Sequence, residues 1–585
     1  MPSTSKGTSV VIANNDIVYI WWTVPRKIND CLGFSIHRII NGKEEKKGLK
    51  ATVGFDVVAD KRKSPQTTDE WPLQTFNWKD LYAPHDKRIQ YRIIPMRGTW
   101  DNLQADRKLS FVTPAIMRTQ TYDDLKVIFN RGLLSTQAFS KRGGVEGVKD
   151  KAGARSILSD PSNTWRKRLA GQMLYNIHAF FKKGKDEGGR FYAALYELTD
   201  KELVKYLTDA DDIEIILSNA NSAKTQTVDG KKKQVTVPDG TNAKTRAALK
   251  KLAMQGRLKI YDRMLGSHIG HNKFVVYAGA DGKPQSVLTG STNWTATGLC
   301  GQTNNMVFIH SAKVAEQYLE YWQQLLADQK QEAALRSWCA GNSKKWSLKG
   351  AAELSVWYAP NTKQKNKPAK NAATPVDIET VYKLLRKAKK SILFLLFNPG
   401  SPSILDEIKT VSEARPENKP LYIRGAISDV KIAEKVITDI YSRDAEVPPD
   451  RYVVTGVAAI PGPFSYFEQE LLKLGHATIH DKVLVIDPFE KDCVVITGSH
   501  NLGFRASYCN DENLLIIQKD PKVARAYAAH VLDVVNHFKW RYHLQDKIKK
   551  AGAKTPAQKK KVLEKEWNDL DESDGWMDAY FDHQG

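Results

Sequence analysis

The stretch HNKFVVYAGADGKPQSVLTGSTN, residues 271–293, has a counterpart later in the same chain, HDKVLVIDPFEKDCVVITGSHN, residues 480–501. Each copy begins with His-x-Lys, continues as an apolar strand and ends in Gly-Ser-x-Asn. The two histidines are 209 residues apart (480 − 271), and the two asparagines are 208 apart (501 − 293). A single His-x-Lys carries no information, but two copies at matched spacing predict a phosphate-binding catalytic pair.

The alternation of a β-strand predicts how each copy presents its side chains. Positions i and i+2 of a strand lie on the same side of a sheet, so we expect His271 and Lys273 to project into one pocket. Gly290 permits close backbone approach, and the turn that follows it should bring Asn293 beside them. A cationic lysine and an amide then converge on one anionic site. The second copy repeats this set with His480, Lys482 and Asn501.

The duplication extends beyond the two motifs. Strand–helix–strand patterns recur over residues 191–218 and 391–426, which is the signature of α/β folds. A helix after each motif carries apolar residues at the spacing of one core-facing side. We therefore predict two duplicated α/β halves. The repeated helix positions are Val314, Tyr318, Trp322 and Leu325 in the first half and, 209 residues on, Val523, Tyr527, Val531 and Val534.

Outside these halves the composition changes. Residues 8–115 consist of short stretches rich in β-branched and aromatic residues with turns between them, which predicts an all-β sandwich. Its early tryptophan and late Tyr-Arg-Ile strand resemble a fibronectin type III module. The polar, lysine-rich segment after residue 342 predicts a linker. The predicted division is a β-sandwich at 1–118, a first half at 119–342, a linker at 343–374, a second half at 375–545 and a helical tail at 546–585.

The charge balance suggests an anionic partner. The chain has 88 Lys and Arg against 66 Asp and Glu, a net charge of +22, which attracts nucleic acid or an anionic phospholipid membrane. The first residues lack the apolar core of a signal peptide, and no run reaches the ~18 apolar residues of a membrane span. The five cysteines form no Cys-x-x-Cys, which suits a reducing compartment. We expect a cytoplasmic monomer or homodimer, with signal-independent secretion left open.

The two motifs together resemble the phospholipase D superfamily, over roughly residues 185–540. The resemblance implies phospholipase D-like α/β/α sandwich halves that form one bilobed catalytic unit with a single site at their interface. A neutral imidazole can attack phosphorus to give a phosphohistidine. A protonated imidazole can donate its proton to the leaving oxygen. By the resemblance, His271 is the nucleophile and His480 the general acid/base; the residues themselves do not distinguish the two.

The two copies depart from the family pattern in different ways. The pattern continues with an aspartate, which the second copy has as Asp487, whereas the first copy has Ala278. Glu512 and Asn304 both lie 11 residues after their motif asparagine. In the family an acidic residue near this position orients a catalytic histidine, so we expect that role for Glu512. The asymmetry resembles tyrosyl-DNA phosphodiesterase-like members. For Asp487 we expect a turn or buried hydrogen bond rather than catalysis.

Three further residues are candidates for substrate binding, and four histidines raise the question of a metal. Trp294 could stack on a base or lie in the core, and the two motif serines could contact substrate. Four histidines could bind zinc if they met, but no cysteine or carboxylate pattern accompanies them, so we expect no metal and no cofactor. The serines are Ser291 and Ser499, and the histidines are His268, His271, His476 and His480.

The sequence thus favours a metal-independent phosphodiesterase acting through a phosphohistidine, with DNA or RNA as the expected substrate. Two alternatives stay open. One is a phospholipase D-type hydrolase of glycerophospholipids whose basic surface docks on an anionic membrane. The other is a catalytically inactive scaffold that binds polyanions. Because a fold of this kind hosts several substrates, the fold cannot choose among them.

Overall fold

The computed structural model describes residues 7–133, 151–428, 451–455 and 479–552, with short gaps at 56–61, 64, 220, 229, 239, 266–267, 329, 417–418 and 420, together with residues 555 and 558. The chain divides into two compact units, residues 1–120 with 553–585, and residues 121–552. The predicted helical tail falls largely outside the described residues. In the part of the chain that is described, no helix has the length and apolar character needed to cross a bilayer.

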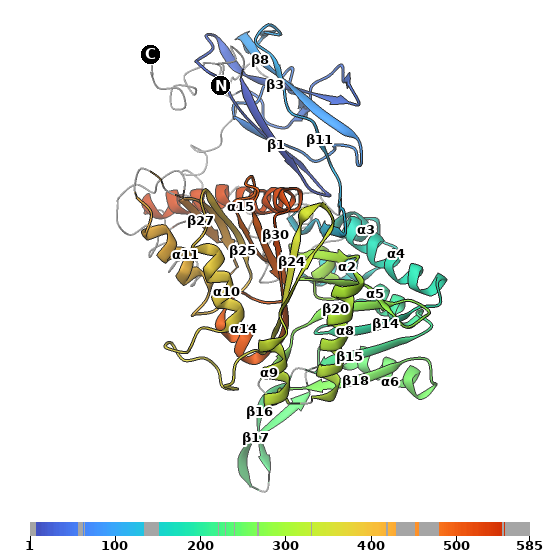
Figure 1. Cartoon of the computed structure of the whole chain (residues 1–585). Helices are drawn as coiled ribbons and strands as arrows, with labels where there is room; N and C mark the ends of the chain where they lie inside the picture. Colours follow the sequence, from blue (N-terminus) through green and yellow to red (C-terminus); the bar gives the residue numbers. More distant parts are fainter. Residues whose placement is uncertain are drawn as a thin grey trace. The chain divides into compact units, whose positions relative to one another are not determined.

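The N-terminal unit is built from β-sheets (Figure 1), which confirms the predicted β-rich region. Apolar side chains of the two larger sheets, including Trp22, Phe34 and Tyr91, pack into one core. One sheet pairs β1 (Thr8–Ala13), β2 (Val18–Thr23) and β7 (Asn77–Asp80). The next runs β10 (Phe111–Val112), β8 (Arg88–Thr99), β3 (Cys31–Ile40), β4 (Lys43–Glu44), with β9 (Asn102–Ala105) and β11 (Ile116–Met117) also on β8; β5 (Lys50–Ala51) pairs β6 (Gln66–Thr67).

The first half of the second unit is an eight-stranded sheet with helices on both faces. On β20, Val275 and Tyr277 join the core formed with the α2–α7 helices, whereas Phe274 contacts Tyr318 of α8 on the opposite face. The strand order is β12 (Thr121–Tyr122), β13 (Leu125–Phe129), β22 (Asn305–Ile309), β21 (Pro284–Gly290), β20 (Lys273–Ala278), β14 (Arg190–Leu195), β15 (Ile213–Asn219), β18 (Lys259–Met264). The helices are α2 (Lys151–Ser159), α3 (Thr164–Ala170), α4 (Gln172–Asp186), α5 (Lys201–Thr208), α6 (Ala243–Met254), α7 (Ala296–Cys300) and α8 (Ala312–Ala327).

The second half repeats this architecture in a nine-stranded sheet. Helices α10, α11 and α14 share a core with one face of it, and α15 packs on β25–β29. The main path is β23 (Lys344–Ser347), β24 (Glu353–Ala359), β30 (Asn510–Gln518), β29 (Val494–Gly498), β28 (Lys482–Ile486), β25 (Ser391–Leu396), β26 (Tyr422–Ile427), β27 (Arg451–Thr455). The helices are α9 (Ala333–Gly341), a 3-10 turn at Lys349–Ala351, α10 (Val376–Leu385), α11 (Ile404–Glu413), α14 (Phe504–Cys509) and α15 (Pro521–Lys550).

The two sheets have the same connectivity. The path β13-β22-β21-β20-β14-β15-β18 corresponds strand by strand to β24-β30-β29-β28-β25-β26-β27. In each, the central strand (β14 or β25) pairs antiparallel with the motif strand and in parallel with the next strand, which itself pairs in parallel with the last strand of the path. The eight predicted helix positions on α8 and α15 are all buried. The predicted fold class of duplicated α/β halves is therefore confirmed.

The predicted linker at 343–374 is wrong over its first half. Residues 344–359 contain β23 and β24, and β24 pairs along its whole length with β30. The alternating burial of β24, from Leu354 to Tyr358, is that of a strand with one face on a core. The lysine-rich sequence around this short strand led to the prediction of a linker. Its counterpart in the first half is β13, so the second half begins before residue 375.

The two halves contact each other through the residues that directly precede the motif histidines. In the first half, β19 (Ile269–Gly270) pairs in parallel with Asn510 and Asp511 of β30, and the counterpart is a bridge between Thr303 and Ile479. Each crossing is main-chain pairing between one half and the segment that leads into the other half's histidine. The histidine-bearing segments are therefore fixed by the opposite half.

A symmetric network of side-chain amides lies beneath these crossings. Asn513 donates to Asn272 at 3.1 Å and accepts from the Thr289 and Tyr318 hydroxyls at 2.8 and 3.1 Å, all from the first half. Asn305, the equivalent amide of the first half, makes the corresponding contacts with residues of the second half. Asn305 donates to Asp481 at 3.1 Å and accepts from Thr497 and Tyr527 at 3.0 and 3.2 Å. The middle residues of both His-x-Lys motifs thus hold the halves together.

Candidate active site between the two halves

The two motif strands place their lysines at equivalent points. Lys273 begins β20 opposite Leu195, and Lys482 begins β28 opposite Leu396. Nζ of each lysine donates to the carbonyl oxygen of the histidine two residues earlier, at 2.7 Å in both copies. Both lysines and both histidines are at most 4 % exposed. The structure therefore brings each predicted His and Lys to one side of its strand.

Glycine turns position the two asparagines. Gly290 and Gly498 have φ of 140° and 129°, and a Cβ at either position would collide with the carbonyl oxygen of Asn305 or Asn513. Only glycine fits both conditions without strain. Nδ2 of Asn293 donates to Glu197 at 2.7 Å, and Oδ1 of Asn501 is buried without a hydrogen-bond partner.

Each histidine has a partner from the other half. Nδ1 of His271 lies 3.3 Å from Oε1 of Glu512, and Nδ1 of His480 lies 2.9 Å from Oδ1 of Asn304. Oδ1 of Asn304 also accepts from Ser291, and its amide nitrogen donates to the Gly298 carbonyl. The amide orientation is thereby fixed, so Nδ1 of His480 must be the donor. One histidine faces a carboxylate and the other an amide.

Burial dominates the electrostatics of the four basic groups. It lowers the pKa of His271 to about 4 and that of Lys482 to about 7, with Lys273 adding to the effect at His271 and Glu512 opposing it at both. Burial, with the charge of Lys482, also holds the pKa values of His480 and Lys273 well below their usual ranges. The pKa of Glu512 is lowered, because its interactions with His271, His500 and Asn510 outweigh the opposing effect of burial. An anion among these groups would restore the lysine charges.

Two aromatic side chains and one carboxylate of the site escaped the sequence reasoning. Tyr196 lies 4.9 Å from His271 and Phe397 lies 4.7 Å from His480, measured between ring centroids. Lys273 lies over Tyr196 and Lys482 over Phe397. Both aromatic residues directly follow equivalent strands, β14 and β25. Their equivalent positions in the two halves were the feature of the sequence that could have predicted them. Glu197, the next residue, contributes a carboxylate that acts on both lysines.

The two motif serines and Trp294 have structural partners in this fold, and their contact with substrate stays a prediction. Ser291 and Ser499 are fully buried, and their hydroxyls accept from the backbone nitrogens of Asn305 and Asn513, so they fix the turns. Trp294 is 1 % exposed and packs against Phe181 in the core, which is one of the two places expected for it.

Asp487 takes the structural role expected of it. Its carboxylate accepts from the backbone nitrogens of residues 389, 390 and 391, which lead into β25. The residue therefore joins the end of β28 to the start of the neighbouring strand and lies away from the lysine end of β28. The Ala278 of the first copy ends the equivalent strand without such a clamp.

The histidines weighed as zinc ligands form no metal-binding group within the described residues. His268 contacts Gln331 through Nδ1 at 2.6 Å, and His271 and His480 have the partners given above. His476 lies outside the described residues. Among the residues that the structure describes, no group of three or more His, Cys, Asp or Glu side chains is placed to hold a metal ion.

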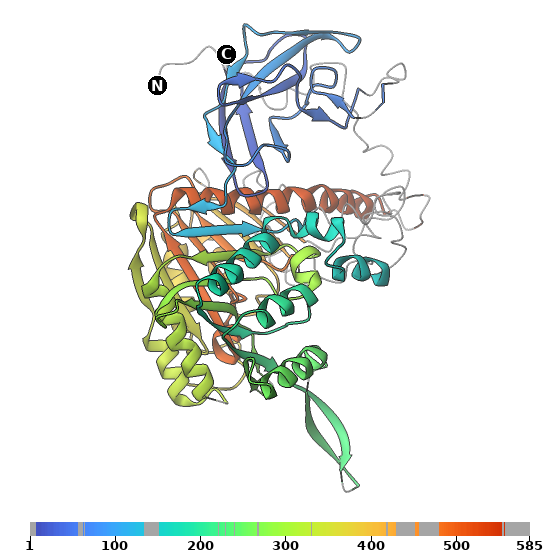
Figure 2. The ribbon, with the colours of Figure 1, turned by 90° about the vertical axis from the view of Figure 1, so that its right-hand side faces the viewer.

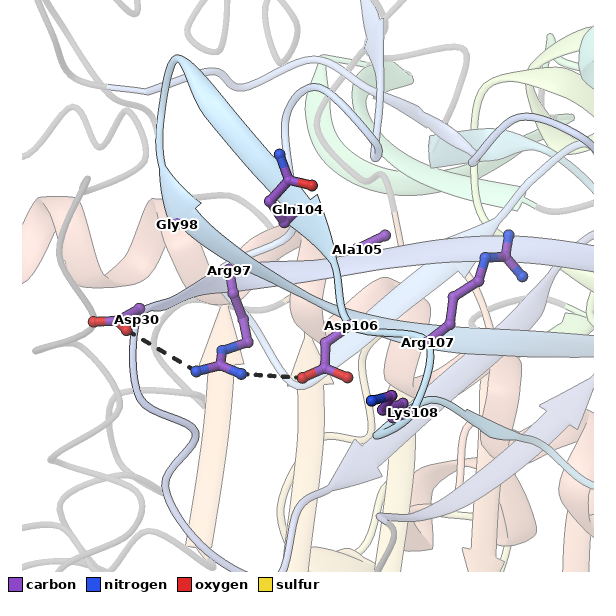
Figure 3. Close-up of a pocket in the computed structure, with 8 residues that line it drawn as sticks. All are labelled: Asp30, Arg97, Gly98, Gln104, Ala105, Asp106, Arg107 and Lys108. Carbon is purple, nitrogen blue, oxygen red and sulfur yellow. Dashed lines mark hydrogen bonds and ion pairs between the residues drawn. The ribbon is translucent and has the colours of Figure 1, made fainter.

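A separate surface hollow of about 580 Å³ lies on the N-terminal unit (Figure 3). It is lined by the β8–β9 hairpin and the segment after it, where Arg97 bridges Asp30 and Asp106 at 4.0 and 3.2 Å. These ion pairs engage three of the polar side chains that line the hollow. None of the motif residues lines it, so it is distinct from the His-Lys-Asn site.

Residues 188–326 and 463–534 match the family model described as cardiolipin synthase, PLD-like domain. No curated protein matches the chain. The chain is 14% identical to the phosphatidylserine synthase of Haemophilus influenzae Rd KW20, with 68% of this chain and 91% of that chain covered and a TM-score of 0.41.

Two other similar structures are smaller or more distant. A phospholipase D family member, Nuc, from Salmonella typhimurium is 19% identical over 32% of this chain and 95% of its own, with a TM-score of 0.21. A mutant of the yeast tyrosyl-DNA phosphodiesterase is 10% identical over 59% of this chain and 86% of its own, with a TM-score of 0.30.

Proposed function

We propose that this chain, which carries a phospholipase D-like domain in two segments at residues 188–326 and 463–534, is a metal-independent phosphodiesterase that works through a phosphohistidine. The observation that carries the proposal is the meeting of both His-Lys-Asn sets at the interface of the halves, each histidine contacting a partner from the other half. One site therefore requires both copies.

The chemistry divides between the two imidazoles. Nε2 of His271 attacks phosphorus, forming an N–P bond while the bond from phosphorus to the leaving oxygen breaks. Protonated His480 gives its proton to that oxygen and then takes one from the water that attacks the phosphohistidine. The second displacement releases the phosphate monoester and free His271. Lys273 and Lys482, with amide donors from Asn293 and Asn501, stabilise charge on the non-bridging oxygens.

The partners of the histidines support this assignment. An ionised Glu512 beside Nδ1 of His271 favours the proton on that nitrogen, which leaves the Nε2 lone pair free, and it stabilises the positive charge that develops during attack. Asn304 can hold the ring of His480 but adds no charge. The low pKa of His271, about 4, keeps its imidazole neutral at physiological pH. The negative charge of a bound phosphodiester would raise the pKa of His480 and so favour its protonated form.

As substrate we propose DNA or RNA. The support is the net charge of +22, because a repeating polyanion gains from a basic surface along its length. A glycerophospholipid would contact the same catalytic groups. Hydrolysis of such a lipid, without cleavage of nucleic acid, would change the proposed substrate class.

A four-substrate assay tests this. Single-stranded DNA, duplex DNA, RNA and mixed phospholipid vesicles are each incubated with the full chain in EDTA. We expect cleavage of nucleic acid that is lost in His271→Ala and His480→Ala and retained in His178→Ala, a control on the exposed side of α4. Cleavage that EDTA abolishes, or that survives in His271→Ala, would overturn the proposal.

For the N-terminal unit we propose a fibronectin type III-like module. Its strand orders, β1-β2-β7 and β10-β8-β3-β4, and its buried Trp22 and Tyr91 support the resemblance. A module of this kind serves as a spacer or a binding surface, and removal of residues 1–118 should leave the hydrolysis of a small diester unchanged.

A further inference from the structure

A lysine-rich hairpin grows out of the first half. It consists of β16 (Asn221–Val228) and β17 (Lys231–Pro238), which pair antiparallel over eight positions between β15 and α6. In both views the hairpin projects from the body of the second unit (Figures 1 and 2). Among the described strands, β16 and β17 pair only with each other.

The root of the hairpin lies at the catalytic edge of the sheet. Leu217 of β15 is the register partner of Leu195 of β14, and Leu195 is the partner of Lys273 of β20. The hairpin starts just beyond Leu217, two strands from Lys273. Neighbouring strands are about 4.8 Å apart, so this lateral offset is roughly 10 Å. The hairpin is therefore rooted beside the site.

The sequence of the hairpin has a positive net charge. Residues 221–238 contain four lysines and one acidic residue, Asp229, a net charge of +3 (4 − 1). In the register of the two strands, Lys231 is the partner of Val228, Lys232 of Thr227 and Lys233 of Gln226, and Lys224 is the partner of Val235. Three of the four lysines therefore belong to the three register pairs nearest the tip.

We propose that this hairpin is an arm that binds the phosphates of a nucleic-acid strand whose scissile diester lies between Lys273 and Lys482. The inference rests on the proposed phosphodiesterase function and adds its substrate class. Eight residues of strand extend about 26 Å. One strand of a duplex has a phosphate every ~3.4 Å of axis, so the arm reaches on the order of seven nucleotides from the cleavage point.

The tip favours a polyanion in water over a bilayer. Residues 228–231, Val-Asp-Gly-Lys, contain an acidic side chain and no aromatic side chain. Membrane-inserting tips carry large apolar or aromatic residues that enter the headgroup region. A hairpin with four lysines and no such residue at its tip suits the negative charge of a phosphate backbone.

The test replaces the four hairpin lysines with glutamine in the full chain (K224Q/K231Q/K232Q/K233Q). The matched control makes the same change at four exposed lysines of the same unit, K363Q/K365Q/K367Q/K370Q. Binding of a 30-nucleotide single-stranded DNA is measured from 50 to 300 mM salt, and hydrolysis is compared between a 3-mer, the 30-mer and bis(4-nitrophenyl) phosphate.

We expect the hairpin variant to bind the 30-mer at least tenfold more weakly than the control. The slope of log K against log salt should fall by about 0.7 for each lost phosphate contact. Hydrolysis of the 3-mer and of the small diester should not change. An unchanged slope, or an equal loss of hydrolysis on the 3-mer, would overturn the proposal.

Failure of the proposed function gives a different result. If no form of the protein hydrolyses the small diester, the catalytic proposal fails, while the slope for the 30-mer still reports on the arm. If the small diester is hydrolysed and the slopes of variant and control agree, the arm is refuted and the catalytic proposal stands.

Discussion

Nδ1 of His271 and Oε1 of Glu512 lie 3.3 Å apart although the two residues belong to different halves of the chain. Glu512 is fully buried and also accepts a hydrogen bond from Asn510 at 2.7 Å. The corresponding histidine of the other half, His480, meets the neutral amide of Asn304. The duplication thus supplies two similar imidazoles, and their partners from the opposite half make them chemically different.

Replacement of Glu512 by glutamine tests this difference. The amide keeps the shape of the side chain but removes the charge that supports attack by His271. We expect kcat on bis(4-nitrophenyl) phosphate to fall by roughly 10²–10³, within the ~10²–10⁴ range of general acid–base effects, with little change in KM. Glu413→Gln, on the exposed side of α11, is the control. A tenfold rise in KM at constant kcat would show that Glu512 acts on binding instead.

Asn304→Asp makes the converse change. A carboxylate at Nδ1 of His480 stabilises the imidazolium, so the pKa of His480 should rise. Because a general acid is lost above its pKa, the alkaline limb of kcat/KM should move to higher pH. A pH–rate profile of the wild type and the variant measures this shift. An unmoved alkaline limb would contradict the assigned role of His480.

Anion binding should take up protons near neutral pH. The pKa of Lys482 is about 7 and that of Lys273 is well below its usual range, both chiefly through burial. A bound anion raises both values, so the bound state holds more protons, and affinity should fall as pH rises through 7. Calorimetry with sulfate, in two buffers of different ionisation enthalpy, measures the uptake. Lys482→Met should reduce it, and sulfate binding independent of pH would contradict the account.

The interface amides should contribute to stability. Asn513→Leu leaves Asn272, Thr289 and Tyr318 without their buried partner. Each such group costs about 1–3 kcal/mol, so we expect a loss on the order of 3 kcal/mol in the unfolding of the second unit. Urea denaturation compares this variant with Asn102→Leu, an exposed position on β9. A loss no larger than that of the control would mean that the network is dispensable.

A buried pair behind Asn501 should make stability depend on pH. Nε2 of His500 lies 3.3 Å from Asp377 and 3.0 Å from the Ser507 hydroxyl. Burial opposes protonation, but Asp377 outweighs it and raises the pKa of His500. The stabilisation is therefore complete below the unfolded pKa, ~6.5, and is lost as pH rises through the raised value.

Asp377→Asn should destabilise the protein more at pH 6 than at pH 9, as measured by urea unfolding at both values. Because the pair supports the turn that ends at Asn501, we also expect a fall of about tenfold in kcat. His178→Ala serves again as the exposed control. An equal loss of stability at both pH values would show that His500 carries no charge in the fold.

Much of the site could be predicted from the sequence because the duplication repeats the same residue types at matched spacing in both halves. The paired motifs, the glycine turns and the equivalence of Glu512 with Asn304 could all be read from matched spacing. The linker prediction failed because β24 derives its strand structure from pairing with β30, which is more than 150 residues away. The structural partners of Trp294 and the motif serines could not be predicted, because they are core and backbone groups that only the folded chain brings near.

The aromatic residues of the site show the same limit. Tyr196 and Phe397 differ in identity, and neither belongs to a motif, so only their equal positions after β14 and β25 marked them. Which histidine meets a carboxylate also depends on the crossing of the halves. A close neighbour in space that comes from the opposite half leaves no local signal.

The most direct test of the central claim is to identify the phosphorylated residue. The His480→Asn variant is incubated in EDTA with bis(4-nitrophenyl) phosphate, whose leaving group needs no proton, and its peptides are analysed by mass spectrometry under alkaline conditions. We predict a phosphoryl ester on His271 that accumulates in His480→Asn and is absent from His271→Asn/His480→Asn. Phosphorylation at another residue, or hydrolysis at the wild-type rate without any adduct, would contradict a shared site in which His271 is the nucleophile.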